Sequence, residues 1–331
     1  MLKDGITIAG NIIVDTNKFI SHYPKEGYLT HINKSYDTLG GSVPNVSVSL
    51  RAIDKNLNIL AMGTIGKDSK GKLALDYFKE NNINYENVEI SLNHQTSYVD
   101  ALMNEYNKKR TFLFYEGANG IFGKNLKEVT TKHFHLGYLL LLPYLDKLKN
   151  NETKASLWLK KLKEQGITTS CDLVTEDSNR YIEVIKPSLP YIDYLIINEL
   201  EASKLSKIDI YDNEELNLNK LIKCAEVIKD MGVIKEVIIH SPKISIIYNG
   251  SETIKLKSLN INSKDIINSV GAGDAFCAGI LYGIINKKSS IEKLRIASSL
   301  AVSCLFSNTP KPIHNSLEEI LLLEKKYGRL N

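Results

Sequence analysis

Residues 221–240 read LIKCAEVIKDMGVIKEVIIH, and this stretch carries the pattern that decides the fold class. Apolar residues recur at helical spacing from Leu221 to Ile228, Gly232 follows, and residues 237–239 form a β-branched run. The pattern predicts an amphipathic helix, a helix stop and then a buried strand.

The same order occurs earlier in the chain. Apolar residues lie at helical spacing between Ala155 and Leu162, Gly166 follows, and residues 167–169 are again suited to a strand. Alternating helices and strands are typical of a mostly parallel sheet covered by helices. We therefore predict an α/β fold.

The N-terminal third breaks this rhythm in two places. Residues 6–9 and 12–14 have the pattern of strands, but a polar stretch fills 15–39, and two further strand-like runs lie within 95–116 on either side of a polar turn at 104–110. Because a two-stranded hairpin is only marginally stable, we expect these strands to pair and to pack on the main body as a lid. The prediction is a single domain over residues 1–331, with the lid inserted from about 15–39 and 95–116.

Composition excludes several classes of protein. Of 331 residues, 43% are hydrophobic and 24% are charged, which excludes disordered and collagen-like chains. A net charge of +4 without a long basic block argues against a nucleic-acid partner. Small-molecule chemistry is the expected role.

The cysteines and the N-terminus indicate the compartment. The four cysteines show no C-x-x-C spacing, so we expect reduced, buried thiols rather than a zinc or redox site. No signal-peptide pattern begins the chain, and the apolar run at 139–142 is too short to span a bilayer. We expect a cytoplasmic protein with no membrane partner.

Residues 268–281, NSVGAGDAFCAGIL, carry the clearest chemistry. The helix-like pattern after them places Gly271, Ala272 and Gly273 at a helix N-terminus, where N–H groups and the helix dipole favour an anion. Asp274 would then stand beside a phosphate cradle as a proton acceptor. The alternative is a tight turn whose aspartate only caps the helix. A dinucleotide-binding fingerprint fails, because Phe276 occupies its third glycine position.

This segment resembles the C-terminal signature of the ribokinase-like (PfkB) carbohydrate kinase family, with the Gly-Ala-Gly-Asp core intact. The resemblance extends over essentially the whole chain and implies a doubly wound α/β domain with a small β-sheet lid. Three further matches occur in the family's order: Gly40-Gly41 with Asn45, residues 63–68 with Gly71, and Asn198-Glu199-Leu200-Glu201.

The resemblance implies roles for the phosphoryl-transfer residues. Asp274 matches the family's catalytic base, and Gly271, Ala272 and Gly273 match its anion hole. Asn198 and Glu201 match the residues that organise Mg²⁺ and phosphate, with Glu201 holding the ion through water. The alternative is that this Asn-x-x-Glu only begins a helix with favourably placed acids.

The resemblance also implies an acceptor site. Asp15 matches the carboxylate that binds sugar hydroxyls, while Gly40 and Gly41 let the chain pass close to a sugar that Asn45 would hydrogen-bond. Asn119 belongs to a Gly-Ala-Asn turn near the sugar and lid. The alternatives are ordinary turn and junction residues.

The chain departs from the family pattern at three places. Val43 stands where a small residue or proline is usual, which leaves the acceptor's identity open. Asn268-Ser269 replaces a frequent Asp-Thr, so a monovalent cation remains only an option. The segment 240–243 lacks the usual glycine turn, so adenosine contacts do not carry over, and Asn308 is a candidate to approach the base.

The resulting expectation is an ATP- and Mg²⁺-dependent kinase. It would transfer the γ-phosphoryl group to a hydroxyl, expected to be a hydroxymethyl, of a monosaccharide or sugar acid. The alternatives are a nucleoside kinase of the same fold and a non-catalytic ligand-binding relative. Strand edges in the lid also suit a homodimer interface.

Overall fold

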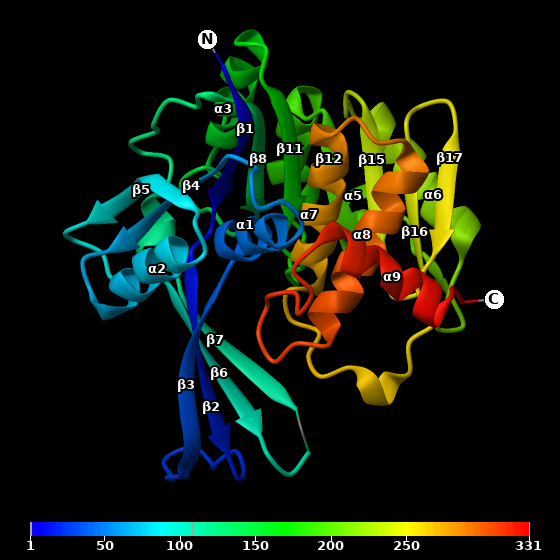
Figure 1. The fold of residues 1–331 in the computed structure, drawn as a ribbon. Helices are drawn as coiled ribbons and strands as arrows, with labels where there is room; N and C mark the ends of the chain where they lie inside the picture. The colour runs from blue at the N-terminus through cyan, green and yellow to red at the C-terminus, as the bar shows by residue number, and fades with distance from the viewer. Residues whose placement is uncertain (1, 108, 331) are drawn as a thin grey trace.

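A computed structural model describes residues 2–107 and 109–330 of the chain (Figure 1). The ends of the predicted domain, Met1 and Asn331, and Lys108 in the predicted polar turn lie outside the described residues.

A large sheet forms the centre of the protein, with nine strands among the described residues, in the order β17-β16-β15-β12-β11-β8-β1-β4-β5. The pairs from β15 to β5 are parallel, whereas β16 runs antiparallel to both of its neighbours. The bounds are β1 Lys3–Gly10, β4 Ile59–Gly66, β5 Asn84–Ser91, β8 Thr131–Leu139, β11 Thr168–Leu173, β12 Tyr194–Asn198, β15 Glu236–His240, β16 Ile244–Tyr248 and β17 Thr253–Lys257.

Helices cover both faces of this sheet, because successive side chains of each strand point to opposite sides. Ile196 and Ile238 pack with one group of helices, while Leu195 and Val237 pack with the other. The first group is α1 Ser42–Ile53, α2 Ser69–Glu80, α7 Ala272–Ile285, α8 Ser290–Leu305 and α9 Leu317–Tyr327. The second is α3 Lys154–Glu164, α4 Tyr181–Ile185, α5 Glu199–Ser206 and α6 Leu218–Asp230.

The lid is a separate four-stranded sheet with the order β3-β2-β6-β7 (Figure 1). Its strands are β2 Ile13–Ile20, β3 Ile32–Gly40, β6 Tyr98–Asn104 and β7 Arg110–Tyr115. The structure therefore has strands within both segments expected to form the lid. The sequence pattern indicated a strand only at residues 12–14, whereas β2 continues to Ile20. Residues 15–19 are half buried and therefore lack the apolar pattern of a buried strand.

The remaining elements are short. They are the hairpins β9 Leu148–Lys149 with β10 Glu152–Thr153 and β13 Tyr211–Asp212 with β14 Glu215–Leu216, and the 3-10 helices η1 Gly117–Ile121, η2 Lys186–Tyr191 and η3 Ser263–Asp265. In the described part of the chain, no helix is both long enough and apolar enough to cross a membrane.

The parallel strands set the position of the site. β1, β8, β11, β12 and β15 all end at one edge of the sheet, and α1 and α7 begin there. Ligands of open α/β sheets bind at this carboxyl edge. Segments far apart in the sequence can thus contribute to one site.

Candidate active site

The N-terminus of α7 provides backbone donors. Gly271 caps the helix at φ 82°, a conformation that favours glycine, and a Cβ there would lie 2.5 Å from Pro310 Cβ. Among the described residues, the amides of Gly271 and Gly273 donate to no carbonyl, and that of Ala272 reaches Ser269 O at 3.3 Å. The turn therefore presents N–H groups and the positive end of the helix dipole to an anion.

Asp274 lies in the first turn of the same helix and is buried. Asn45 Nδ2 donates to its Oδ2 over 2.9 Å, and the Tyr138 hydroxyl donates to its Oδ1 over 2.7 Å. Burial, together with the negative charge of Asp172, raises the pKa of Asp274 to about 7. A carboxyl group tuned in this way can take up a proton near neutral pH.

Asp15 lies within β2, at the base of the lid, and not in a turn. Its carboxylate accepts no hydrogen bond from any described residue, and burial raises its pKa to about 6. Gly40 lies in the neighbouring strand β3, where it pairs with Ile13, and a Cβ on Gly40 would collide with Asp15 Oδ2. The glycine therefore makes room for this carboxylate.

The start of α1 lies against the same region. Gly41 has φ 89°, and a Cβ there would lie 2.6 Å from the Asn11 carbonyl oxygen. Asn45, four residues later, is buried, and its Oδ1 has no hydrogen-bond partner within residues 2–107 and 109–330. Its Nδ2 is used by Asp274, so the carboxamide joins the start of α1 to α7.

Asn119 is fully buried in η1. Its Oδ1 accepts from the Ile12 amide over 3.3 Å, which ties η1 to the strand leading into the lid. Its Nδ2 donates to nothing in the described part of the chain. One end of Asn119 is thus structural, and the other can still donate.

Asn198 and Glu201 form a reciprocal capping box at the start of α5. The Asn198 side chain accepts from the Glu201 amide over 2.9 Å, and Glu201 Oε2 accepts from the Asn198 amide over 3.0 Å. Glu201 Oε1 accepts from the Thr175 hydroxyl over 2.7 Å, and burial raises the pKa of Glu201 to about 7. The helix start weighed as the alternative is therefore present, with a capping box in addition, and Asn198 also lines the cleft described next.

A cleft of about 600 Å³ opens beside the turn at residues 271–273. Ala272 and Gly273 line it with Asn198, and His240 and Phe276 form part of its wall with ring centroids 4.7 Å apart. Burial lowers the pKa of His240 to about 4, so its ring is neutral. Asn308 is exposed and is not among the lining residues.

The motif at residues 63–71 supports the base of the lid. Asp68 caps α2 by accepting from the Gly71 amide over 2.7 Å. The same carboxylate accepts from the Thr96 amide over 2.8 Å and from its hydroxyl over 2.7 Å. Thr96 precedes β6, so Asp68 fixes the point where the chain enters the lid.

Sequence reasoning missed Tyr138. It lies near the end of β8, between Gly137 and Leu139, and no sequence motif marks it as a site residue. Asn11 positions it by accepting from the Tyr138 amide over 2.6 Å while donating to the Leu141 carbonyl over 2.8 Å. Only the tertiary structure shows that it contacts Asp274.

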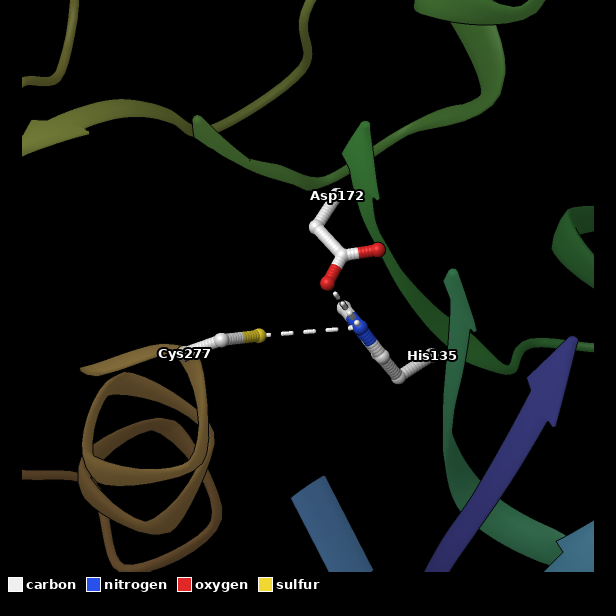
Figure 2. A group of neighbouring side chains, drawn as sticks. All are labelled: His135, Asp172 and Cys277. Carbon is white, nitrogen blue, oxygen red and sulfur yellow. Dashed lines mark hydrogen bonds and ion pairs between the residues drawn. The ribbon is translucent and has the colours of Figure 1, made fainter. Parts of the chain in front are cut away.

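A buried cluster of His135, Asp172 and Cys277 lies next to these residues (Figure 2). His135 Nε2 is 3.5 Å from Asp172 Oδ2 and 3.6 Å from Cys277 Sγ, and its Nδ1 is 3.0 Å from Ser170 Oγ. The three side chains offer ligand atoms within 4.8 Å of one another. Burial raises the pKa of the Cys277 thiol, which favours a hydrogen-bonded cluster over a metal thiolate.

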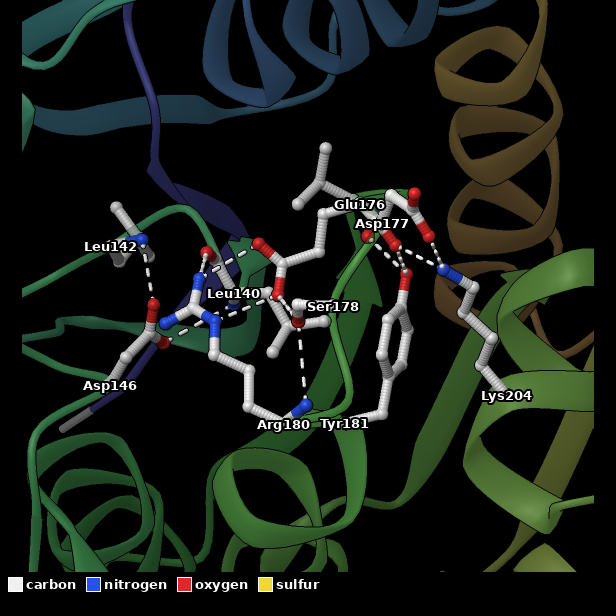
Figure 3. Close-up of polar contacts among 10 residues, drawn as sticks. Leu140, Leu142, Asp146, Glu176, Asp177, Ser178, Arg180, Tyr181 and Lys204 are labelled. Carbon is white, nitrogen blue, oxygen red and sulfur yellow. Dashed lines mark hydrogen bonds and ion pairs between the residues drawn. The ribbon is translucent and has the colours of Figure 1, made fainter.

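A second polar network fixes the loop after β11 (Figure 3). The Arg180 guanidinium donates to both carboxylate oxygens of Glu176, over 2.8 and 2.9 Å, and also to the Leu140 carbonyl. Asp146 accepts from the amides of Leu140 and Leu142, over 3.2 and 3.0 Å. Arg180 is therefore neutralised, and the chain beyond β8 is held in place.

Asn268 stands at the position where the family resemblance left a monovalent-cation ligand open. Its carboxamide oxygen accepts hydrogen bonds from other residues of the protein. Its Oδ1 accepts from the Val270 amide over 3.1 Å and from Arg110 Nη1 over 3.4 Å. Arg110 begins β7, so its hydrogen bond to Asn268 joins the lid to the segment before the turn at residues 271–273.

Comparison with known proteins identifies the family of the chain. Residues 7–312 match the model of the pfkB family carbohydrate kinase. The chain is 23% identical over 330 residues to a ribokinase of Dictyostelium discoideum, covering 96% of this chain and 100% of that protein. It is 24% identical over 314 residues to a 5-dehydro-2-deoxygluconokinase of Clostridium beijerinckii, covering 93% and 88%.

Solved structures share the fold. The structure of Arabidopsis thaliana ribokinase complexed with ribose and ATP matches with a TM-score of 0.82 at 19% identity. The match covers 97% of this chain and 99% of that one. The architecture of a large sheet with a small β-sheet lid is therefore common to both proteins.

Proposed function

The chain belongs to the pfkB family of carbohydrate kinases, and from this premise we propose that it transfers the γ-phosphoryl group of ATP to a hydroxymethyl group of a monosaccharide or related polyol, with Asp274 as general base. The observation that carries the proposal is that Asp274 lies in the same helical turn as the amides of Gly271 and Gly273, which donate to no carbonyl among the described residues. One rigid turn thus presents a proton acceptor and an anion-binding surface together.

Asp274 would take the proton of the acceptor hydroxyl. Asn45 and Tyr138 hold its two oxygens from different elements, which fixes the direction of the carboxylate. With a pKa of about 7, a sizeable fraction is ionised at neutral pH, and the group remains basic enough to accept a proton.

The turn at 271–273 would stabilise the phosphoryl group during transfer. Charge develops on the equatorial oxygens of that group, and preoriented amides stabilise it without reorganising. The neighbouring cleft of about 600 Å³ would hold the rest of the nucleotide. The lid, whose base Asp68 fixes, would exclude water that competes as an acceptor.

Glu201 and Asn198 suit a magnesium ion held through water. Carboxylate and carboxamide oxygens are hard ligands of the kind Mg²⁺ takes. Both Glu201 oxygens already accept hydrogen bonds from Thr175 and Asn198, which favours contact through the hydration shell. When bound, the ion would neutralise charge on the nucleotide phosphates.

The test is ADP release with ATP and Mg²⁺ over a panel of ribose, fructose, sugar acids, sugar phosphates and nucleosides. Asp274→Asn is expected to lower kcat by about 10²–10⁴-fold while the protein stays folded. Asp177→Asn, the same change at an exposed aspartate beside Lys204, is the matched control and should keep full activity. Wild-type turnover in Asp274→Asn, or acceptor binding without any ADP release in the wild type, would contradict the proposal.

A further inference from the structure

Arg110 is a lid residue that reaches the segment leading into α7. It begins β7 and is exposed, and its Nη1 donates to Asn268 Oδ1 over 3.4 Å. The same oxygen accepts from the amide of Val270, the residue directly before Gly271, over 3.1 Å. One carboxamide oxygen therefore holds both the lid arginine and the backbone that enters the turn at residues 271–273.

The strand register places Arg110 on the face of the lid that carries Asp15. Asp15 pairs with Val99 in β6, and Val99 pairs with Phe114 in β7. Paired residues point to the same side of a sheet, and so do residues two positions apart along a strand. Arg110 lies four positions before Phe114, so its side chain shares the face of Asp15. This face is directed toward Asp274, because the charge of Asp15 raises the pKa of Asp274.

The Arg110 guanidinium is not neutralised by the protein. Within residues 2–107 and 109–330 it pairs with no carboxylate, whereas Arg180 and Arg329 each pair with a glutamate. Its hydrogen bond to Asn268 uses Nη1, and a guanidinium has five N–H donors. Most of its donors and its whole charge are therefore left for an anion.

Lys34 is the second cation on this face among the strand residues of the lid, and it is placed differently. It pairs with Phe19, and its ammonium lies 5.7 Å from the ring centroid of Phe19 and 5.2 Å from that of Tyr36. In the part of the chain that the structure describes, this ammonium contacts no acceptor outside the lid. Arg110 is thus the lid cation that lies next to the segment before the turn.

The cleft beside the turn brings no basic side chain of its own. Among the described residues that line it there is no lysine or arginine, and Glu199 adds an acid. Phosphoryl transfer spreads negative charge over the oxygens of the transferring group. A cation that arrives with the lid would add its charge to the stabilisation by the amides at residues 271–273.

We propose that Arg110 is a catalytic residue that binds the transferring phosphoryl group from the lid side. The proposal rests on the proposed function, since it adds a residue to the same reaction. The bond from the γ-phosphorus to the bridging oxygen of ADP breaks, a bond to the acceptor oxygen forms, and the acceptor proton goes to Asp274. Arg110 neither gains nor loses a proton, and its planar N–H groups can hold two phosphoryl oxygens at once.

The first experiment measures kcat and the acceptor KM with saturating ATP and Mg²⁺ and the best acceptor of the panel. Arg110→Gln is expected to lower kcat about 10²–10³-fold, as the loss of a preoriented donor to developing charge does. Lys109→Gln removes the same charge from the neighbouring exposed residue and should keep the wild-type kcat. An unchanged kcat in Arg110→Gln, or a rise in the acceptor KM alone, overturns the inference while the kinase activity stands.

A second experiment separates the charge of Arg110 from its hydrogen bond to Asn268. Free guanidinium ion, below the concentrations that unfold the protein, supplies the charge without joining the lid to Asn268. It is expected to raise the kcat of Arg110→Ala with increasing concentration and to leave Asp274→Asn unchanged. Asn268→Ala removes the partner but keeps the cation, so it should lower kcat less than Arg110→Gln does. Equal losses in these two variants would assign Arg110 to holding the lid and overturn the inference.

Nucleotide binding tests the inference without turnover. The γ-phosphoryl group distinguishes ATP from ADP, so a non-hydrolysable ATP analogue with Mg²⁺ should stabilise the wild type against heat more than ADP does. Arg110→Gln should narrow that difference, and Lys109→Gln should keep it. If no acceptor supports ADP release, the proposed function fails and this comparison decides the inference alone. A difference that stays unchanged in Arg110→Gln would then overturn it.

Discussion

The Asp274→Asn variant is expected to be more stable relative to the wild type as the pH rises, although it loses catalysis. In the folded chain, burial raises the pKa of Asp274 from an ordinary value of 3.8 to about 7. The folded state therefore holds this proton more tightly than the unfolded chain does. Ionisation of Asp274 consequently destabilises the fold progressively between these two pH values.

The magnitude follows from the size of that shift. The rise of the Asp274 pKa from 3.8 to about 7 corresponds to ~4 kcal/mol of destabilisation of the folded state at pH 8, where Asp274 is ionised in both the folded and the unfolded chain. At pH 5 the same group costs about 1.6 kcal/mol, because it is ionised only in the unfolded chain. The carboxamide cannot ionise, so the stability of the variant relative to the wild type should grow by about 2–3 kcal/mol from pH 5 to pH 8.

The assay is urea denaturation of the wild type, Asp274→Asn and Asp177→Asn at pH 5, 6, 7 and 8 without ligands. The other buried acids titrate in all three proteins, so the difference between variant and wild type isolates Asp274 and its repulsion by Asp172 and Asp15. Asp177→Asn should track the wild type, because Asp177 is fully exposed. A stability difference for Asp274→Asn that stays constant with pH would refute the reasoning.

Two further predictions concern the same site. Tyr138→Phe removes a hydrogen bond that lowers the pKa of Asp274. The pH at which kcat is half-maximal should therefore move above about 7. If Tyr138 has a purely structural role, that pH will stay unchanged. Glu201→Gln should raise the Mg²⁺ concentration for half-maximal activity by about tenfold or more, whereas Glu183→Gln, at an exposed glutamate of α4, should not. An unchanged Mg²⁺ requirement in Glu201→Gln would assign Glu201 to capping alone.

The glycine-capped helix start at residues 271–274 could be predicted from the sequence because its parts are contiguous. Gly271 to Asp274 lie on one helical turn, so local geometry alone brings the carboxylate and the amides together. Their roles as base and anion-binding groups stay predictions. The predicted strands and helices were also local, and the structure has elements within each of the segments where they were expected. Placement of the other predicted residues around Asp274 came from the family resemblance and not from any spacing.

Tyr138 and Asp172 could not be found in this way. Tyr138 lies between Gly137 and Leu139, and Asp172 lies between Cys171 and Leu173, and no motif marks either residue as part of a site. They meet Asp274 because β8 and β11 are adjacent parallel strands that end at the edge where α7 begins. Asn45 likewise reaches Asp274 across 229 residues of sequence.

For this protein, the sequence by itself determined the α/β class, the lid segments and the glycine-capped helix start that carries Asp274. Those features follow from periodicity and from groups linked through a few bonds. Only the tertiary structure decided which side chains surround Asp274 and how far its carboxyl group is buried. The physical reason is that burial and the pairing of charges depend on which strands lie side by side, and this is a property of the packed sheet.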